Sequence, residues 1–252
     1  AQFTIGGGAI NTWLNNDGDW SSSGNWSLGT VPGPGQQANT GLTSGPFTIT
    51  IGAGNSTPDS LFSNENITLA GGNLTLANAS TINGIFSVNS GTLAGAGALT
   101  VTGALNLAGG NLASTGGVTF AGTTTVNAGT PQISGILLTD ALNYAGGALT
   151  VANGGRLELT GAGASMVDAR TLEVNAGGVL RLTGAGGMLL NNGAVLNNAG
   201  TVDFNGDADI LNTAGAGTFN NTNTLTKSAG VDVSAIGRIA RPLTFTHSGV
   251  LN

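Results

Sequence analysis

The amino-acid sequence predicts an all-β protein, built as a parallel β-solenoid behind an N-terminal cap. Two observations predict this fold class. A motif of the form Ala-Gly-Gly-x-Leu returns along the chain, and short runs that alternate apolar and small polar residues are separated by turns rich in glycine and asparagine. The copies of the motif lie at residues 70–74, 108–112, 145–149 and 176–180.

The spacing of this motif gives the size of one coil. Gly71 and Gly109 are 38 residues apart, and Gly109 and Gly146 are 37 apart. Each interval holds more than one strand-like run, so one coil takes about 19 residues, a length found in stacked β-solenoid repeats. From about Arg156 the coil lengthens, because residues 157–163 recur as residues 180–186, an offset of 23.

Each longer coil contains three strand-like runs, which predicts a three-sided prism. The runs of two successive coils are 157–159, 166–167 and 172–174, then 180–182, 188–190 and 195–196. Residues 47–252 at about 19 to 23 residues per coil predict about ten coils, with strands about 4.8 Å apart in parallel ladders. A two-layer sandwich is the alternative, but the strands are short and the turns frequent for its hairpins.

The 23-residue offset also predicts which side chains meet across coils. Glu158 is expected beside Arg181 on the outer face, with Asp203 continuing the ladder. Opposite charges on neighbouring strands contribute about 0.2 to 1 kcal/mol, so these charges are interpreted as structural. Asparagines that follow strands are expected to form hydrogen-bonded ladders along the axis, and they are Asn78, Asn89, Asn127, Asn175 and Asn198.

Residues 1–46 differ from the rest because they contain all three tryptophans, Trp13, Trp20 and Trp26. The end of a solenoid exposes unpaired strand edges and an open core, and terminal repeats are atypical for that reason. We therefore expect residues 1–46 to form a cap over a β-helix of residues 47–252. The alternative is a glycan-binding platform, which requires coplanar indoles that face solvent.

Composition excludes several classes of partner. The net charge is −6, and no Lys or Arg precedes residue 156, so binding to nucleic acid is not expected. No apolar run approaches the ~20 residues of a membrane helix, so this segment is not expected to insert into a membrane. The chain has no cysteine and is rich in Gly, Asn, Thr and Ser, a composition that suits a secreted protein of the bacterial cell surface.

One turn is a candidate metal site. Asp203, Asp207 and Asp209, together with Asn205, place oxygen-bearing side chains at alternate positions, as calcium loops do. The segment departs from the EF-hand pattern, because Ala208 replaces the loop glycine and no Glu stands at the twelfth position. A solvated turn is the competing interpretation, and no other cofactor is expected.

Enzymatic and ice-binding alternatives find less support. A glycosidase or polysaccharide lyase needs paired carboxylates, or carboxylates holding calcium beside a base, yet the only dense acidic cluster is the one at residues 203–209. The single histidine, His247, lacks a recognisable nucleophile motif. Ice binding requires Thr-x-Thr at the same place in every coil, and the pairs at residues 48–50 and 123–125 do not recur in this way.

Motifs at both ends of the chain are typical of one class of protein. At the start, Gly-Asn-Trp-Ser at residues 24–27 precedes a Gly-x-Val-Pro at residues 29–32, and near the end similar coils follow one another at residues 217–228 and 245–252. In these segments the chain resembles secreted bacterial β-helix surface proteins of the autotransporter-passenger and adhesin type. The resemblance implies a right-handed, extracellular parallel β-helix that acts as a stalk, adhesin or fibre.

The functional expectation is a surface-displayed scaffold without catalysis, mechanical or adhesive in its role. Head-to-tail self-association into filaments is expected as a hypothesis, because an open coil offers unpaired strand edges to a neighbour. A carbohydrate-binding or polysaccharide-degrading β-helix is the alternative, and surface glycans are then the partners.

Overall fold

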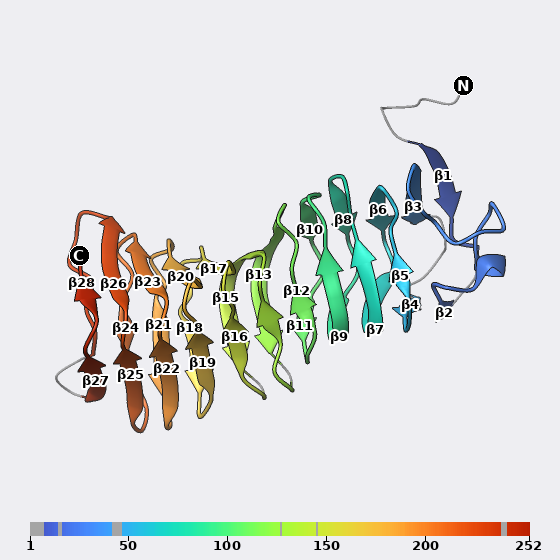
Figure 1. Cartoon of the computed structure of the whole chain (residues 1–252). Helices are drawn as coiled ribbons and strands as arrows, with labels where there is room; N and C mark the ends of the chain where they lie inside the picture. Colours follow the sequence, from blue (N-terminus) through green and yellow to red (C-terminus); the bar gives the residue numbers. More distant parts are fainter. Residues whose placement is uncertain (1–7, 15–16, 42–46, 127, 145, 238–240) are drawn as a thin grey trace.

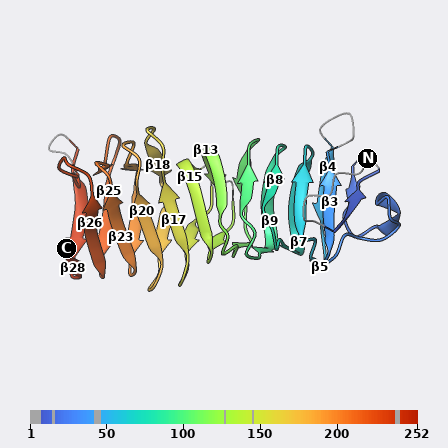
Figure 2. The ribbon, with the colours of Figure 1, turned by 90° about the horizontal axis from the view of Figure 1, so that it is seen from above.

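The computed structural model describes residues 8–14, 17–41, 47–126, 128–144, 146–237 and 241–252. It confirms the predicted all-β solenoid. The coils stack one on another from the N-terminal end to the C-terminal end and form an elongated prism of about nine turns, close to the ten expected (Figures 1 and 2). Within these ranges the one helical element is a single 3-10 turn, η1 (Ser23–Asn25).

Three parallel ladders make up the walls, as the three runs per coil predicted. Ladder 1 contains β1 (Ala9–Thr12), β3 (Gln36–Thr40), β6 (Ser60–Ser63), β8 (Ser80–Ile82), β10 (Leu99–Val101), the first parts of β13 (Val118–Val126) and β15 (Ile136–Tyr144), β17 (Arg156–Leu159), β20 (Val179–Leu182), β23 (Thr201–Asn205), β26 (Thr224–Ala229) and β28 (Val250–Leu251).

Ladder 2 follows ladder 1 within each coil. It contains β2 (Gly18–Asp19), β4 (Thr48–Ile51), the first parts of β7 (Asn66–Thr75) and β9 (Phe86–Ala94), β11 (Leu105–Leu107), the second parts of β13 and β15, β18 (Ser165–Asp168), β21 (Met188–Asn191) and β24 (Ile210–Leu211).

Ladder 3 completes the coil. It contains β5 (Asn55–Ser56), the second parts of β7 and β9, β12 (Asn111–Leu112), β14 (Gln132–Ile133), β16 (Leu149–Val151), β19 (Thr171–Val174), β22 (Ala194–Asn198), β25 (Gly217–Asn221) and β27 (Leu243–His247).

Alternation of buried and exposed side chains builds the core. In a strand successive side chains point to opposite faces, so every second residue enters the prism. In ladder 1 the inward positions form a continuous buried aliphatic column, in register from coil to coil, of Leu99, Val118, Leu137, Leu157, Leu180, Val202 and Leu225. Burial of apolar surface along this thin core is the main stabilising contribution.

The first two copies of the Ala-Gly-Gly-x-Leu motif form the corner between ladders 2 and 3, and the third leads into β16 of ladder 3, whereas the fourth, at residues 176–180, lies between β19 of ladder 3 and β20 of ladder 1. Gly71 and Gly91, in successive coils, have φ angles of 130° and 85°, which a residue with a side chain adopts only with strain. A Cβ atom at Gly91 would lie 2.0 Å from the carbonyl oxygen of Gly72 in the coil before it. Glycine therefore recurs here because the chain turns sharply and the stacked backbones nearly touch.

The coil lengthens in two steps, at turns that the sequence pattern did not locate. Ile133 pairs with Val151. Ile136 lies three positions after Ile133, but its partner Arg156 lies five positions after Val151, so the later coil has gained residues between these two pairs. The first extra residues therefore lie in the turn at residues 152–155. The number of residues between register partners increases again at Asn143 and its partner Met166. The remaining extra residues therefore lie in the turn at residues 160–164.

The predicted charge ladder has the expected register but a different set of ion pairs. Glu158, Arg181 and Asp203 are consecutive outward partners in ladder 1. The Arg181 Nε donates to the Asp203 Oδ2 at 3.0 Å. Glu158 instead lies 3.4 Å from the Arg156 Nε and accepts a hydrogen bond from the Thr183 hydroxyl. Arg181 thus pairs with the coil that follows it.

Asparagine ladders occur, mostly at positions other than those expected. Asn198 is the one predicted member whose side chain bonds across coils within the described residues, donating to the Asn221 Oδ1 at 2.5 Å; Asn127 lies outside those residues. Further cross-coil bonds join Asn73 to Asn55 and Asn83 to Asn64. The prediction failed for Asn78, Asn89 and Asn175 because it placed the ladders at turns, whereas most of these bonds join residues within or at the ends of strands.

Candidate functional site

The three tryptophans lie together at the N-terminal end and are buried, with at most 1 % of each residue's surface exposed. The Trp26 ring meets Trp13 at a centroid distance of 5.0 Å and Trp20 at 4.7 Å, in both cases edge to face. The Trp26 Nε1 donates to the Trp20 carbonyl oxygen at 2.8 Å. These rings do not present the coplanar, solvent-facing surfaces that sugar stacking requires, and their packing fits a cap.

Strands β1 and β3 lie within the predicted cap, yet they already pair in register with each other and with β6 in ladder 1. On its outer side the C-terminal end of β1 is covered by the segment around Trp26. The Ser27 amide donates to the Thr12 carbonyl, and the Leu14 amide donates to the Asn25 carbonyl. The N-terminal edge of ladder 1 is therefore partly closed by antiparallel pairing.

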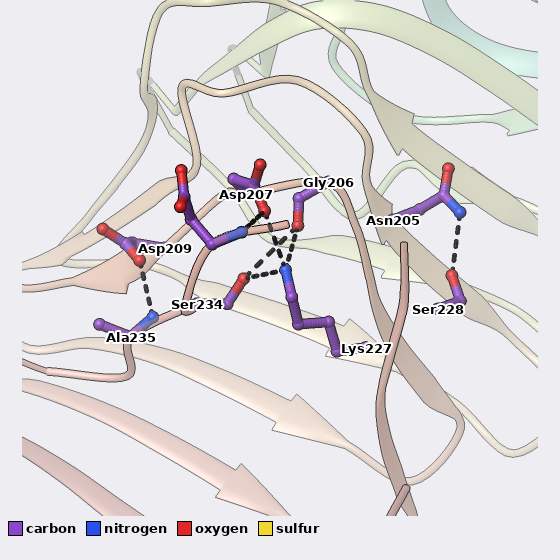
Figure 3. Close-up of polar contacts among 9 residues, drawn as sticks. Asn205, Gly206, Asp207, Asp209, Lys227, Ser228, Ser234 and Ala235 are labelled. Atoms are coloured by element: carbon purple, nitrogen blue, oxygen red, sulfur yellow. Dashed lines mark hydrogen bonds and ion pairs between the residues drawn. The ribbon is translucent and has the colours of Figure 1, made fainter. Parts of the chain in front are cut away.

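The three aspartates proposed as calcium ligands engage three different partners. Asp203 is buried against Arg181, as described above. Asp207 accepts hydrogen bonds from the Asp232 amide at 2.9 Å and from the Lys227 Nζ at 3.2 Å, and Asp209 accepts one from the Ala235 amide at 2.6 Å (Figure 3). Among the described residues no group of three His, Cys, Asp or Glu converges in a way that suits a metal ion.

Lys227 connects the turn at residues 206–209 to the segment that follows β26. Its Nζ donates to the Gly206 carbonyl oxygen at 2.7 Å and to the Ser234 hydroxyl at 3.0 Å, in addition to Asp207 (Figure 3). The Asp232 amide, together with the Lys227 ammonium, holds the pKa of Asp207 below its ordinary value of 3.8. This cluster therefore fastens the connection between β26 and β27 onto the coil before it.

A second group of polar side chains follows the outer face of ladder 3 and forms a shallow hollow. Glu173, Asn197, Asn220 and Thr246 are register partners on β19, β22, β25 and β27. With Asn198, Ala199 and Thr222 they line a space of about 480 Å³ that is open to solvent. This volume lies within the range of ligand pockets, although it is less enclosed than most.

Hydrogen bonds hold the side chains of this hollow in place. The Asn197 Nδ2 donates to the Glu173 Oε1 at 2.7 Å, and the Asn220 Nδ2 donates to the Asn197 Oδ1 at 2.9 Å. The Thr246 hydroxyl and the Glu173 Oε2 have no hydrogen-bond partner among the described residues. The hollow thus offers ordered amides with spare donor and acceptor capacity, one hydroxyl and one carboxylate oxygen.

The sequence pattern did not identify this hollow. The offset of the longer coils, applied to Glu173, gives Leu196, which points into the core, whereas the true partner is the next residue, Asn197. The additional residue lies in the turn around Asn192 and Gly193, where Asn192 has a φ of 52°. The sequence does contain a signal for part of this hollow, because Asn197 and its partner Asn220 are separated by the regular offset of the longer coils.

No protein-family model matches the chain, and neither the characterised proteins nor the solved structures contain a significant match. Within the described ranges, no helix has the length and apolar character needed to span a membrane.

Proposed function

We propose that the chain is an extracellular β-helical scaffold, a stalk or fibre subunit displayed on the bacterial cell surface that carries out no catalysis. One observation carries this proposal: an in-register stack of coils runs from β1 to β28 along one axis, so the chain's length is used to build a rod. The composition, poor in Lys and rich in Asn, Thr, Ser and Gly, agrees with a secreted location.

The charged side chains near the candidate turn support a mechanical role. Asp203, Asp207 and Lys227 make contacts that join one coil to the next or fasten a connecting segment. Such contacts hold a rod together without forming a reactive site. Incubation with a panel of polysaccharides, followed by a reducing-end assay, tests this part of the proposal: a scaffold releases no new reducing ends, and their steady release would contradict it.

Self-association through the C-terminal edge is part of the proposal. In the part of the chain that the structure describes, β28 pairs only with β26, and its Val250 and Leu251 are 52 % and 59 % exposed. Unpaired edges with exposed apolar side chains favour pairing with another chain. The opposite end is less open, because the segment around Trp26 covers the C-terminal end of β1, so a head-to-tail contact would involve the exposed first residues of this strand.

Sedimentation velocity over a wide concentration range, together with electron microscopy, tests this association. Head-to-tail contact predicts filaments that lengthen with concentration. Monomers at every concentration would remove the filament proposal while leaving the scaffold role intact. Discrete dimers would show that association ends after one contact, which contradicts head-to-tail assembly because a heterologous contact repeats.

A further inference from the structure

The outward face of ladder 3 carries a column of hydrogen-bonding side chains, with one member on each of the ten strands of this ladder that the structure describes. Each member is the register partner of the next, and nine of the ten are uncharged. The members are Asn55, Asn73, Thr92, Asn111, Gln132, Thr150, Glu173, Asn197, Asn220 and Thr246.

The outward columns of the other two ladders differ in chemistry. At the equivalent positions, ladder 1 mixes threonines with Phe62, Leu138 and the ion-paired Arg181. Ladder 2 carries neutral polar residues from Thr50 to Asn143, but Met166 and Leu189 follow them. Among the described strands, ladder 3 alone has a hydrogen-bonding side chain at every position of the column, from Asn55 to Thr246. This continuity distinguishes the ladder 3 face from the other two.

From this column we infer that the ladder 3 face binds an extended, neutral polysaccharide lying along the axis of the rod. Amides and hydroxyls both donate and accept hydrogen bonds, as sugar hydroxyl groups require. Strands in neighbouring coils are about 4.8 Å apart, a repeat comparable with the length of one sugar in an extended chain. The hollow between Glu173 and Thr246, at the C-terminal end of the column, gives a bound chain a recessed contact on this surface.

Charge and backbone pairing select a neutral glycan over other polymers. The column contains no Lys or Arg to contact phosphate, and the Glu173 carboxylate repels anionic chains. A peptide added as a strand needs an unpaired sheet edge, whereas from β7 to β25 the ladder 3 strands pair on both sides. Many weak contacts in a line give useful avidity even when each is small.

The test measures depletion of the intact chain from solution by insoluble polysaccharides. Microcrystalline cellulose and chitin serve as neutral, extended probes, and cross-linked polygalacturonate serves as the anionic comparison. We expect binding to at least one neutral probe that changes little between low and high salt, and weaker binding to polygalacturonate. Absence of binding to both neutral probes, or a preference for polygalacturonate, would overturn the inference.

Matched variants place the binding on ladder 3. Thr246→Val and Thr150→Val each remove one hydroxyl from the column at nearly constant volume, and Thr100→Val removes an exposed hydroxyl from ladder 1. Losing one hydrogen bond predicts binding about 2- to 10-fold weaker for the two ladder 3 variants and unchanged binding for Thr100→Val. Thermal unfolding checks that all three fold. Equal binding by folded Thr246→Val, Thr150→Val and Thr100→Val would contradict the assignment to this face.

Discussion

Replacing Gly91 by alanine tests the explanation given for the recurrent glycine corner. Gly91 lies in β9 at the bend between ladders 2 and 3, with a φ of 85°. The added Cβ would meet the carbonyl oxygen of Gly72 at 2.0 Å, so the backbone of one of the two coils must move. Both the dihedral angle and the close approach therefore oppose the substitution.

The expected cost combines these two effects. A left-handed conformation costs a residue with a side chain about 1 to 2 kcal/mol, and forcing an extra methyl group into a packed site costs about 1 to 3 kcal/mol. Alanine also reduces the entropy of the unfolded chain, which offsets about 0.4 to 1 kcal/mol. We expect Gly91→Ala to lower the free energy of unfolding by about 2 to 4 kcal/mol.

Two other glycines separate the contributions. Gly193 has a φ of 87°, but its added Cβ would have no atom within 4 Å, so Gly193→Ala measures the dihedral effect alone. Gly163 has open space around it and no positive φ, so Gly163→Ala serves as the control and is expected to be neutral or slightly stabilising. The predicted order of destabilisation is Gly91→Ala, then Gly193→Ala, then Gly163→Ala.

Urea unfolding followed by far-ultraviolet circular dichroism measures these differences. Tryptophan fluorescence recorded on the same samples reports only the N-terminal end, because all three tryptophans lie there. The two signals separate if the coils unfold in more than one step, as stacked repeats can. A Gly91→Ala variant as stable as Gly163→Ala would refute the explanation based on close contact between coils.

Three further predictions concern the cap and the charged contacts. Trp26→Ala removes a fully buried ring with two edge-to-face neighbours and is expected to cost about 3 to 5 kcal/mol, moving the fluorescence transition to lower urea than the circular dichroism transition. Arg181→Ala leaves the Asp203 carboxylate without its partner. Because the Arg181 side chain is 32 % exposed and water screens the pair, the expected cost is about 1 to 3 kcal/mol, part of which Asp203→Asn restores in the double variant, as urea titration would reveal. The lowered pKa of Asp207 means that its contacts stabilise the fold above pH 3.8 and are lost as the pH falls through the folded-state value. Hydrogen exchange at the Asp232 amide should therefore accelerate in acid relative to a reference amide, and a pH dependence that persists in Asp207→Asn would contradict this assignment.

The sequence was sufficient to predict the architecture because the repeat and the strand period agree. The return of the glycine motif at 38 and 37 residues, two coils at a time, gave the coil length that the register later confirmed. The offset between Glu158 and Arg181 likewise matched the register. Both succeed because identical positions in successive coils stack directly.

The same reasoning was less informative where turns change length. Insertions near residues 152–155 and 160–164, and one more residue around Asn192, shift the register without altering the strand pattern. An error of one residue exchanges the inward and outward faces, so Glu173 could not be matched to Asn197. The sequence pattern also could not predict which charged residues form ion pairs. The register places Glu158 beside Arg181, but the geometry of the side chain directs this arginine to Asp203.

The register of the three ladders underlies both the scaffold and the glycan-binding proposals, and engineered disulfides test it directly. The native chain has no cysteine, so a pair introduced by Thr81→Cys and Thr100→Cys has no competing thiol. These residues are partners in adjacent coils, about 4.8 Å apart, within the range that a disulfide spans. The register predicts efficient oxidation of this pair and none of the pair Thr81→Cys and Thr119→Cys, which lies two coils apart. Cross-linking of the second pair without the first would contradict the stacked-coil register.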